Sequence, residues 1–106
     1  MREHRLGKTE LLVSELGFGG IPIIPLSMED GADVVRHCYE RGITFFDTAN
    51  AYGDSEKKVG LALADVREEV VLATKTGRRD AAGAAEHLQF SLENLAVYRE
   101  FVALHP

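Results

Sequence analysis

Residues 42–75 read GITFFDTANAYGDSEKKVGLALADVREEVVLATK, and the fold is predicted from this stretch. It contains two apolar runs, residues 43–47 and 69–75, whose β-branched and aromatic side chains favour buried strands. Between the two runs, residues 55–64 place apolar side chains along one side of a short helix. A strand, a helix and a second strand in this order are typical of a parallel βαβ unit buried on both faces.

The same alternation continues on both sides of this stretch. The predicted strands cover residues 15–20, 43–47, 69–75 and 101–105, and the predicted helices between them cover residues 28–41, 55–64 and 84–95. Crossovers between parallel strands are right-handed. The sequence therefore predicts an α/β fold in which four strands lie parallel and alternate with helices.

Local signals mark where several of these elements begin and end. Ser27 is a predicted N-cap with Asp30 three residues later, and Gly42 is the predicted stop of the same helix. Ser55 is a predicted N-cap of the next helix. Residues 21–26 (IPIIPL) contain two prolines, which predicts an extended loop. Two short runs around residues 8–10 predict an N-terminal hairpin.

A chain of 106 residues is large enough for one domain, which we expect to span residues 1–106. Two completions of the strand order are open at this point: a doubly wound open sheet, or the first half of an eight-stranded barrel, whose full form needs about 250 residues. Residues 17–25 read GFGGIPIIP and lack the third glycine of the fingerprint G-x-G-x-x-G, which argues against an open sheet that binds a dinucleotide.

Composition and charge limit which binding partners and which cellular compartment we expect. The formal net charge is −5, which argues against binding nucleic acid or an anionic membrane. The sequence contains two basic pairs, Lys57-Lys58 and Arg78-Arg79, and we predict that both lie on the solvated surface. Cys38 is the only cysteine, so no intrachain disulfide can form, and we expect a cytoplasmic protein. The four histidines lack metal-ligand spacing with one another or with Cys38, so we predict no metal site.

Titratable side chains follow the ends of three successive predicted strands. Asp47 ends one strand and is followed five residues later by Tyr52, Lys75 ends the next strand, and His105 ends the last. Because the carboxyl ends of parallel strands meet at one rim, we expect these four side chains to converge. Each also has an ordinary alternative: a loop cap for Asp47, a loop aromatic for Tyr52, solvent for Lys75 and a disordered end for His105.

An acid, a phenol, an amine and an imidazole on one rim suit the reduction of a carbonyl group. Tyrosine can donate a proton to the carbonyl oxygen, and a nearby ammonium lowers the pKa of a phenol. Lys75 would supply that ammonium, Asp47 would hold Lys75 in place, and His105 would hydrogen-bond the carbonyl oxygen.

The sequence resembles the aldo-keto reductases in the order and spacing of its motifs. These are RLGKTELLVSELGFGGIPI (5–23), GITFFDTANAYGDSEKKVG (42–60), EEVVLATKTGRRD (68–80), SLENL (91–95) and LH (104–105). The chain is most similar to bacterial members with a GFGGIPI opening, some of which carry an iron–sulfur ferredoxin-like tail that this sequence lacks.

The resemblance implies a TIM (β/α)8 barrel, NADP or NAD as cofactor and a small-molecule carbonyl substrate. The tetrad of that family falls on Asp47, Tyr52, Lys75 and His105, and its cofactor-side positions fall on Gly19, Gly20 and Asp47. The chain then represents an N-terminal hairpin and the first half of the barrel, a truncated form. Ala96 stands where the family usually has glycine, and the last run is one residue short, which affects the reach of His105.

Two functions remain open on the sequence. The chain is either an oxidoreductase of aldo-keto reductase type, or a catalytically inactive remnant or fragment that acts as an assembly or regulatory partner. Because a half barrel exposes a strand edge and an inner face, we also expect a homodimer that completes eight strands.

Overall fold

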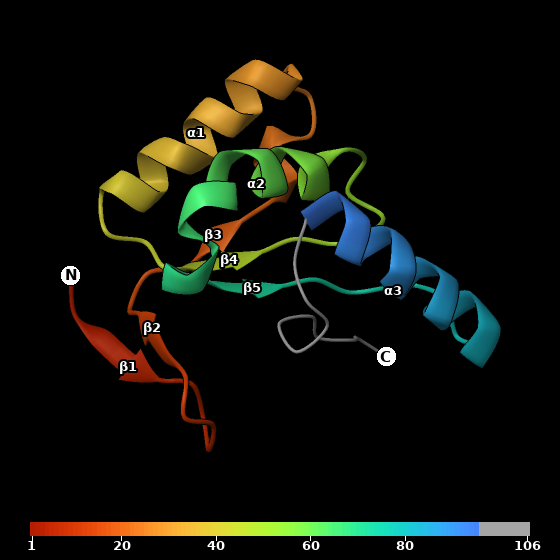
Figure 1. The fold of residues 1–106 in the computed structure, drawn as a ribbon, viewed down its shortest axis with the longest axis horizontal. Coiled ribbons are helices and arrows are strands. Elements are labelled where there is room, and N and C mark those ends of the chain that lie inside the picture. Colours follow the sequence, from red (N-terminus) through yellow and green to blue (C-terminus); the bar gives the residue numbers. More distant parts are fainter. Residues whose placement is uncertain (96–106) are drawn as a thin grey trace.

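The computed structural model describes residues 1–95 (Figure 1). The fourth predicted strand, residues 101–105, and His105 lie outside the described residues. An antiparallel hairpin opens the chain, formed by β1 (Glu3–Arg5) and β2 (Leu12–Ser14). Gly7 lies in its turn with φ +57°, a left-handed conformation that glycine adopts without strain. The predicted hairpin is therefore confirmed.

A three-stranded parallel sheet forms the centre of the described structure. Its strands are β3 (Phe18–Gly19), β4 (Phe45–Asp47) and β5 (Val71–Ala73), in the order β3-β4-β5. Gly19 pairs with Asp47, and Asp47 with Ala73, so the carboxyl ends of all three strands lie at the same level. Three of the four predicted strands are thus confirmed as parallel neighbours, each shorter than its apolar run.

Each strand is followed by a helix. These helices are α1 (Met28–Glu40), α2 (Ser55–Leu63) and α3 (Ala81–Leu95), with a 3-10 segment, η2 (Ala64–Glu69), after α2. α1 begins as predicted: the Ser27 side chain accepts a hydrogen bond from the Asp30 amide at 3.0 Å. It ends before Gly42, whose φ is +106°. The described chain therefore contains three βα units after the hairpin.

The core lies between the sheet and the helices. Figure 1 shows α1 and α2 side by side over the strands, with α3 beyond α2. Phe46 and Leu72 point from the sheet into this layer, and the rings of Phe18 and Phe46 lie 5.5 Å apart. The helices and the segment after α2 contribute the buried side chains Val35, Val59, Leu63, Val66 and Leu95.

Three local predictions differ from the structure. Residues Ile21–Ile23 form a short 3-10 helix, η1, where we expected an extended loop, because Pro22 lies in its first turn, where proline's missing N–H costs nothing. In α1, of the side chains that the pattern places on the apolar face, Val35, Cys38 and Tyr39 do pack on the core, but Val34 is 41% exposed. In α2, Leu61 is 60% exposed although we placed it on the apolar side.

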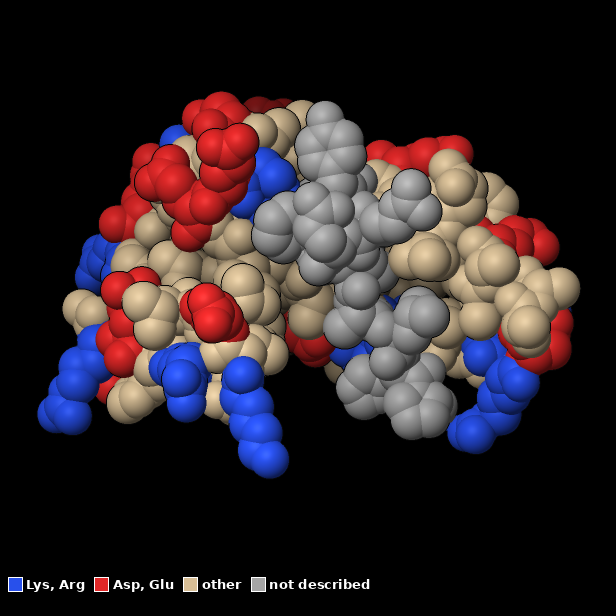
Figure 2. Space-filling view, turned by 60° about the horizontal axis from the view of Figure 1, so that its bottom comes forward, with Lys and Arg blue, Asp and Glu red and all other residues tan. Residues whose placement is uncertain are grey.

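Charged side chains are spread over the surface. On the face in Figure 2, acidic side chains appear at both ends of the described surface, and several basic ones reach out along its lower edge. Within residues 1–95, no helix is long and apolar enough to cross a membrane. In the same residues, no group of three metal-binding side chains comes together.

Candidate active site

The backbone of β4 and β5 continues in parallel beyond the strand ends. The Thr48 amide donates to the Ala73 carbonyl at 2.9 Å, and the Asn50 amide donates to the Lys75 carbonyl at 3.0 Å. These bonds carry residue 75 to the same rim as Asp47, the last residue of β4. The predicted convergence of the two strand ends is therefore present in the structure.

The Lys75 ammonium joins the two strand ends. Its Nζ donates to Asp47 Oδ2 at 2.8 Å and to the Thr48 carbonyl at 2.8 Å. The Lys75 side chain is 20% exposed and that of Asp47 is 47% exposed, so the pair faces solvent on one side. Two acceptors at 2.8 Å hold the amine in one orientation between the strand ends.

Tyr52 reaches the same ammonium from the loop between β4 and α2. The Lys75 Nζ lies 5.1 Å from the centroid of the Tyr52 ring, within the range of a cation–π interaction. The Tyr52 amide donates to the Ala49 carbonyl, and the Tyr52 carbonyl accepts from the Ser55 amide. Asp47, Tyr52 and Lys75 thus come together around one amine.

The two predicted glycines lie beside this cluster but differ in surroundings. Gly19, at the end of β3, is exposed, and a Cβ built on it would meet no atom within 4 Å. Gly20 donates its amide to the Asp47 carbonyl at 2.8 Å. A Cβ on Gly20 would lie 2.5 Å from Ser55 Oγ and 2.9 Å from Thr48 Oγ1. Beside Asp47, the backbone is therefore open to solvent at Gly19 and closely packed at Gly20.

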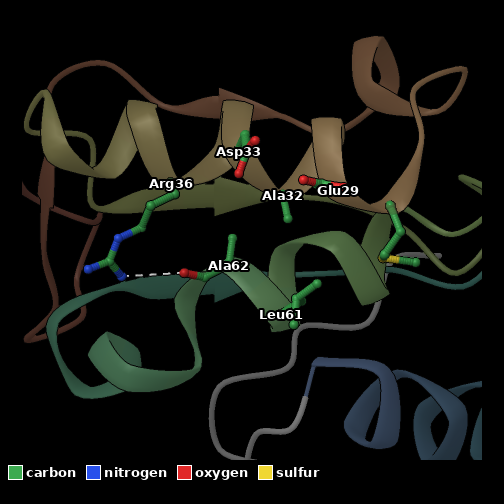
Figure 3. Close-up of a pocket in the computed structure, with 7 residues that line it drawn as sticks. Glu29, Ala32, Asp33, Arg36, Leu61 and Ala62 are labelled. Carbon is green, nitrogen blue, oxygen red and sulfur yellow. Dashed lines mark hydrogen bonds between the residues drawn. The ribbon is translucent and has the colours of Figure 1, made fainter.

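A cavity of about 430 Å³ lies between α1 and α2 (Figure 3). Ala32, Leu61 and Ala62 line its apolar part, and Glu29 and Asp33 stand at its mouth. Arg36 spans one end, where it bonds the Ala62 carbonyl and the Asp65 carboxylate. The described residues that line the cavity carry two carboxylates and one guanidinium that is already bonded to these partners, and they include no phenol or amine like those at the strand-end rim.

Comparison with known proteins identifies the family of the chain. Residues 15–105 match the model of the Aldo/keto reductase family. The chain belongs to the aldo/keto reductases. The match covers the strand-end cluster and all three described βα units, so the recognition made from the sequence motifs is confirmed.

Individual aldo/keto reductases agree with this assignment. The chain is 42% identical over 81 residues to probable aldo-keto reductase 1 of Glycine max, which covers 69% of the chain and 23% of that protein. It is 40% identical over 82 residues to L-galactose dehydrogenase of Arabidopsis thaliana, which covers 69% of the chain and 26% of that protein. The chain thus spans about a quarter of the length of these relatives.

A solved aldo/keto reductase has the same fold. The holo form of aldo-keto reductase AKR11C1 from Bacillus halodurans superposes with a TM-score of 0.81 at 32% identity, covering 92% of this chain and 37% of that one. The parallel βα arrangement described above is therefore that of an aldo/keto reductase. The comparison confirms the α/β fold class of an aldo/keto reductase barrel, whereas four βα units that form half a barrel stay a prediction.

Several residues that hold this aldo/keto reductase rim together were missed from the sequence. Ser55 is the predicted N-cap, but it is the first residue of α2, after Asp54, and its hydroxyl pairs with Thr48 Oγ1 at 2.8 Å and donates to the Gly20 carbonyl at 3.1 Å. Glu56 is buried and accepts from Thr74 Oγ1 at 2.6 Å and Asn94 Nδ2 at 3.1 Å. Ser55 and Glu56 lie one helical turn before the buried residues Val59 and Gly60, and this spacing could have predicted that they face the protein interior.

The surface prediction for the basic pairs is wrong at one position. Lys57, Arg78 and Arg79 are exposed, but Lys58 is fully buried. Its Nζ forms an ion pair with Asp54 Oδ1 at 2.5 Å. The hydrogen bond from Lys58 holds the pKa of the Asp54 carboxyl below its usual range. The physical reason for the error is that two carbonyls of a distant loop, those of Ile23 and Ile24, join Asp54 around the amine.

Proposed function

We propose that this chain carries the proton-transfer residues of an NAD(P)H-dependent reductase that converts a small-molecule carbonyl to an alcohol. The observation that carries the proposal is the single amine of Lys75, 2.8 Å from an Asp47 oxygen and 5.1 Å from the Tyr52 ring centroid. An ammonium beside a phenol, held by a carboxylate, is an arrangement suited to a tyrosine that acts as a general acid.

The residues of the chain have separate roles in this reaction. The Tyr52 hydroxyl donates its proton to the carbonyl oxygen as negative charge grows there, and the resulting phenolate is reprotonated from water. Lys75 stabilises the phenolate through its positive charge, and Asp47 holds the amine in place through its hydrogen bond. His105, which lies outside the described residues, is proposed to hydrogen-bond the carbonyl oxygen. Substrate carbon and oxygen thus gain a hydride and a proton respectively, giving the alcohol.

The rim leaves room for a nicotinamide beside the acid. Gly19 is exposed and has no neighbour where a Cβ would stand, so a flat group can approach the backbone next to Asp47. We propose Gly19, Gly20 and Asp47 as the positions on the cofactor side. A reduced nicotinamide, when bound, supplies the hydride. NADP is our first choice over NAD because the family resemblance favours it.

Cofactor binding tests this proposal directly. Titrating NADPH against the protein, followed by the change in cofactor fluorescence, should give saturable binding in the micromolar range. Lys57→Met, at an exposed position, serves as a matched control and should bind equally well. No binding by folded protein would reject the reductase and favour the alternative of an inactive remnant that acts as an assembly or regulatory partner.

The remaining expectations concern the assembly and its compartment. We propose that residues 1–106 form one half-barrel domain of a cytoplasmic protein, and that two copies pair to complete eight strands. Phe45 and Val71 are paired in register and only partly buried. Because side chains alternate along a strand, they point to the face opposite Phe46 and Leu72. That face would be covered in the pair.

Light scattering after size exclusion measures the proposed pairing. We expect a mass twice that of the 11.7 kDa chain. A monomer that keeps its helical circular dichroism would contradict the homodimer and leave the assignment of the proton-transfer residues unaffected.

A further inference from the structure

Lys58 is a buried ion whose amine is fully satisfied by the protein. Its side chain is 0% exposed. Its Nζ contacts Asp54 Oδ1 at 2.5 Å, the Ile23 carbonyl at 2.9 Å and the Ile24 carbonyl at 3.2 Å. Three acceptors match the three N–H groups of an ammonium, which offsets the cost of taking the charge out of water.

The acceptors belong to two loops at the rim. Ile23 and Ile24 lie at the end of η1, which follows β3, and Asp54 lies two residues after Tyr52 in the loop that follows β4. The loops also touch each other: a Cβ on Gly53 would lie 3.4 Å from Ile24 Cγ2, and Gly53 has φ +58°. Lys58 therefore ties the segment that bears Tyr52 to the neighbouring strand's loop.

Both ends of the same segment are also held by a second set of bonds. Thr48, Ser55 and the Gly20 carbonyl form a buried hydroxyl chain with bonds of 2.8 and 3.1 Å. This chain holds residues 48 and 55, on either side of Tyr52, to the end of β3. With Lys58 acting on residue 54, little of the loop is left to move independently of the sheet.

The packing of α1 reserves space for the Lys58 stem. Gly31 lies on the buried side of α1, and a Cβ there would lie 2.5 Å from Lys58 Cδ and 3.0 Å from its Cε. Any larger residue at position 31 would force the stem aside. The amine thus reaches the two loops only because α1 carries a glycine opposite it.

We propose that Lys58 is a positioning residue that fixes Tyr52 over the Lys75 amine. This inference rests on the proposed function, in which Tyr52 is the acid. Displacement of a reacting group by about 1 Å costs roughly 100-fold in rate, so a tie two residues from Tyr52 affects chemistry as well as folding. Lys75 touches the phenol and changes its charge environment, whereas Lys58 acts through the backbone.

The variant Lys58→Met tests the proposal, because methionine keeps the length of the stem and removes the N–H donors. Lys57→Met is the matched control at the neighbouring exposed position. The first readout needs neither cofactor nor substrate: a nuclear Overhauser contact between the Tyr52 ring protons and the Lys75 side chain. We expect this contact in the unmodified protein and in Lys57→Met, and its loss in Lys58→Met.

Kinetics provide the second readout. We expect Lys58→Met to lower kcat by about 10- to 100-fold while KM for NADPH stays within a factor of about three, since the tie acts on the acid and not on the cofactor surface. A purely structural role would lower Tm but leave the Tyr52–Lys75 contact and kcat unchanged, and this result would overturn the proposal.

A second variant keeps the test decisive if Lys58→Met does not fold. Asp54→Ala removes the acceptor nearest to Tyr52, on a side chain that is 45% exposed, and leaves the two carbonyl acceptors of Lys58 in place. Loss of the Tyr52–Lys75 contact in folded Asp54→Ala supports the proposal, and retention of the contact overturns it. The contact is measured without catalysis. If the unmodified protein proves inactive, the proposed function is rejected, but the contact still decides whether Lys58 positions Tyr52.

Discussion

Tyr52→Phe is expected to abolish carbonyl reduction, lowering kcat by about 100- to 10,000-fold, the usual contribution of a general acid. The phenylalanine ring keeps the contact with the Lys75 amine, 5.1 Å from the ring centroid, and removes only the hydroxyl that donates the proton. Cofactor affinity should therefore stay nearly unchanged. Steady-state reduction of a carbonyl substrate, together with NADPH titration, measures both effects.

Tyr39→Phe is the matched control for this prediction. The Tyr39 hydroxyl donates to Glu69 Oε1 at 3.0 Å, far from the rim, and this bond raises the pKa of Tyr39. Removing that hydroxyl should leave kcat unaffected. Equal activity of Tyr52→Phe and the unmodified protein would show that another group supplies the proton.

Phe46→Ala should destabilise the fold by about 3–5 kcal/mol, the range measured for truncating a buried phenylalanine. Phe46 is 1% exposed, and its ring packs against Phe18 at a centroid distance of 5.5 Å. Because a domain's total stability is about 5–15 kcal/mol, and a short one lies low in that range, the loss would unfold much of the protein. Urea unfolding followed by circular dichroism gives the change in free energy.

Phe90→Ala is the corresponding control on α3, where the phenylalanine is 47% exposed. Its removal should change the free energy of unfolding by about 0.5 kcal/mol or less, as for most surface substitutions. A similar loss for both variants would mean that the sheet–helix layer around Phe46 is not the main core.

The fold was predictable where one physical signal dominated. The apolar runs at 43–47 and 69–75 can be buried only in a sheet covered by helices, and β4 and β5 lie inside them. Parallel topology then brings the ends of both strands to one rim, so the approach of Asp47 and Lys75 followed from the strand order, and the chemistry of an acid and an amine suggested the ion pair. The loop after β3 was not predictable in the same way, because two prolines fit an extended loop and the first turn of η1 equally well.

Residues whose partners come from distant segments could not be placed from local patterns. The residues around Ser55 predict an N-cap. In the structure, its hydroxyl instead forms hydrogen bonds with Thr48 and the Gly20 carbonyl inside the protein. Lys58 reads as solvated, yet carbonyls 34 and 35 residues earlier surround its amine. Such sites depend on how loops meet, and neither helix periodicity nor residue type contains that information.

The fit of Lys58 into the space beside Gly31 has an evolutionary consequence. A Cβ at position 31 would come within 2.5 Å of the lysine stem, so a side chain there and a long side chain at position 58 exclude each other. Among homologous sequences, the two positions should therefore covary, with glycine at 31 accompanying lysine at 58 and a larger residue accompanying a shorter one. Homologues that keep the pair would be those in which the buried amine has been retained by selection.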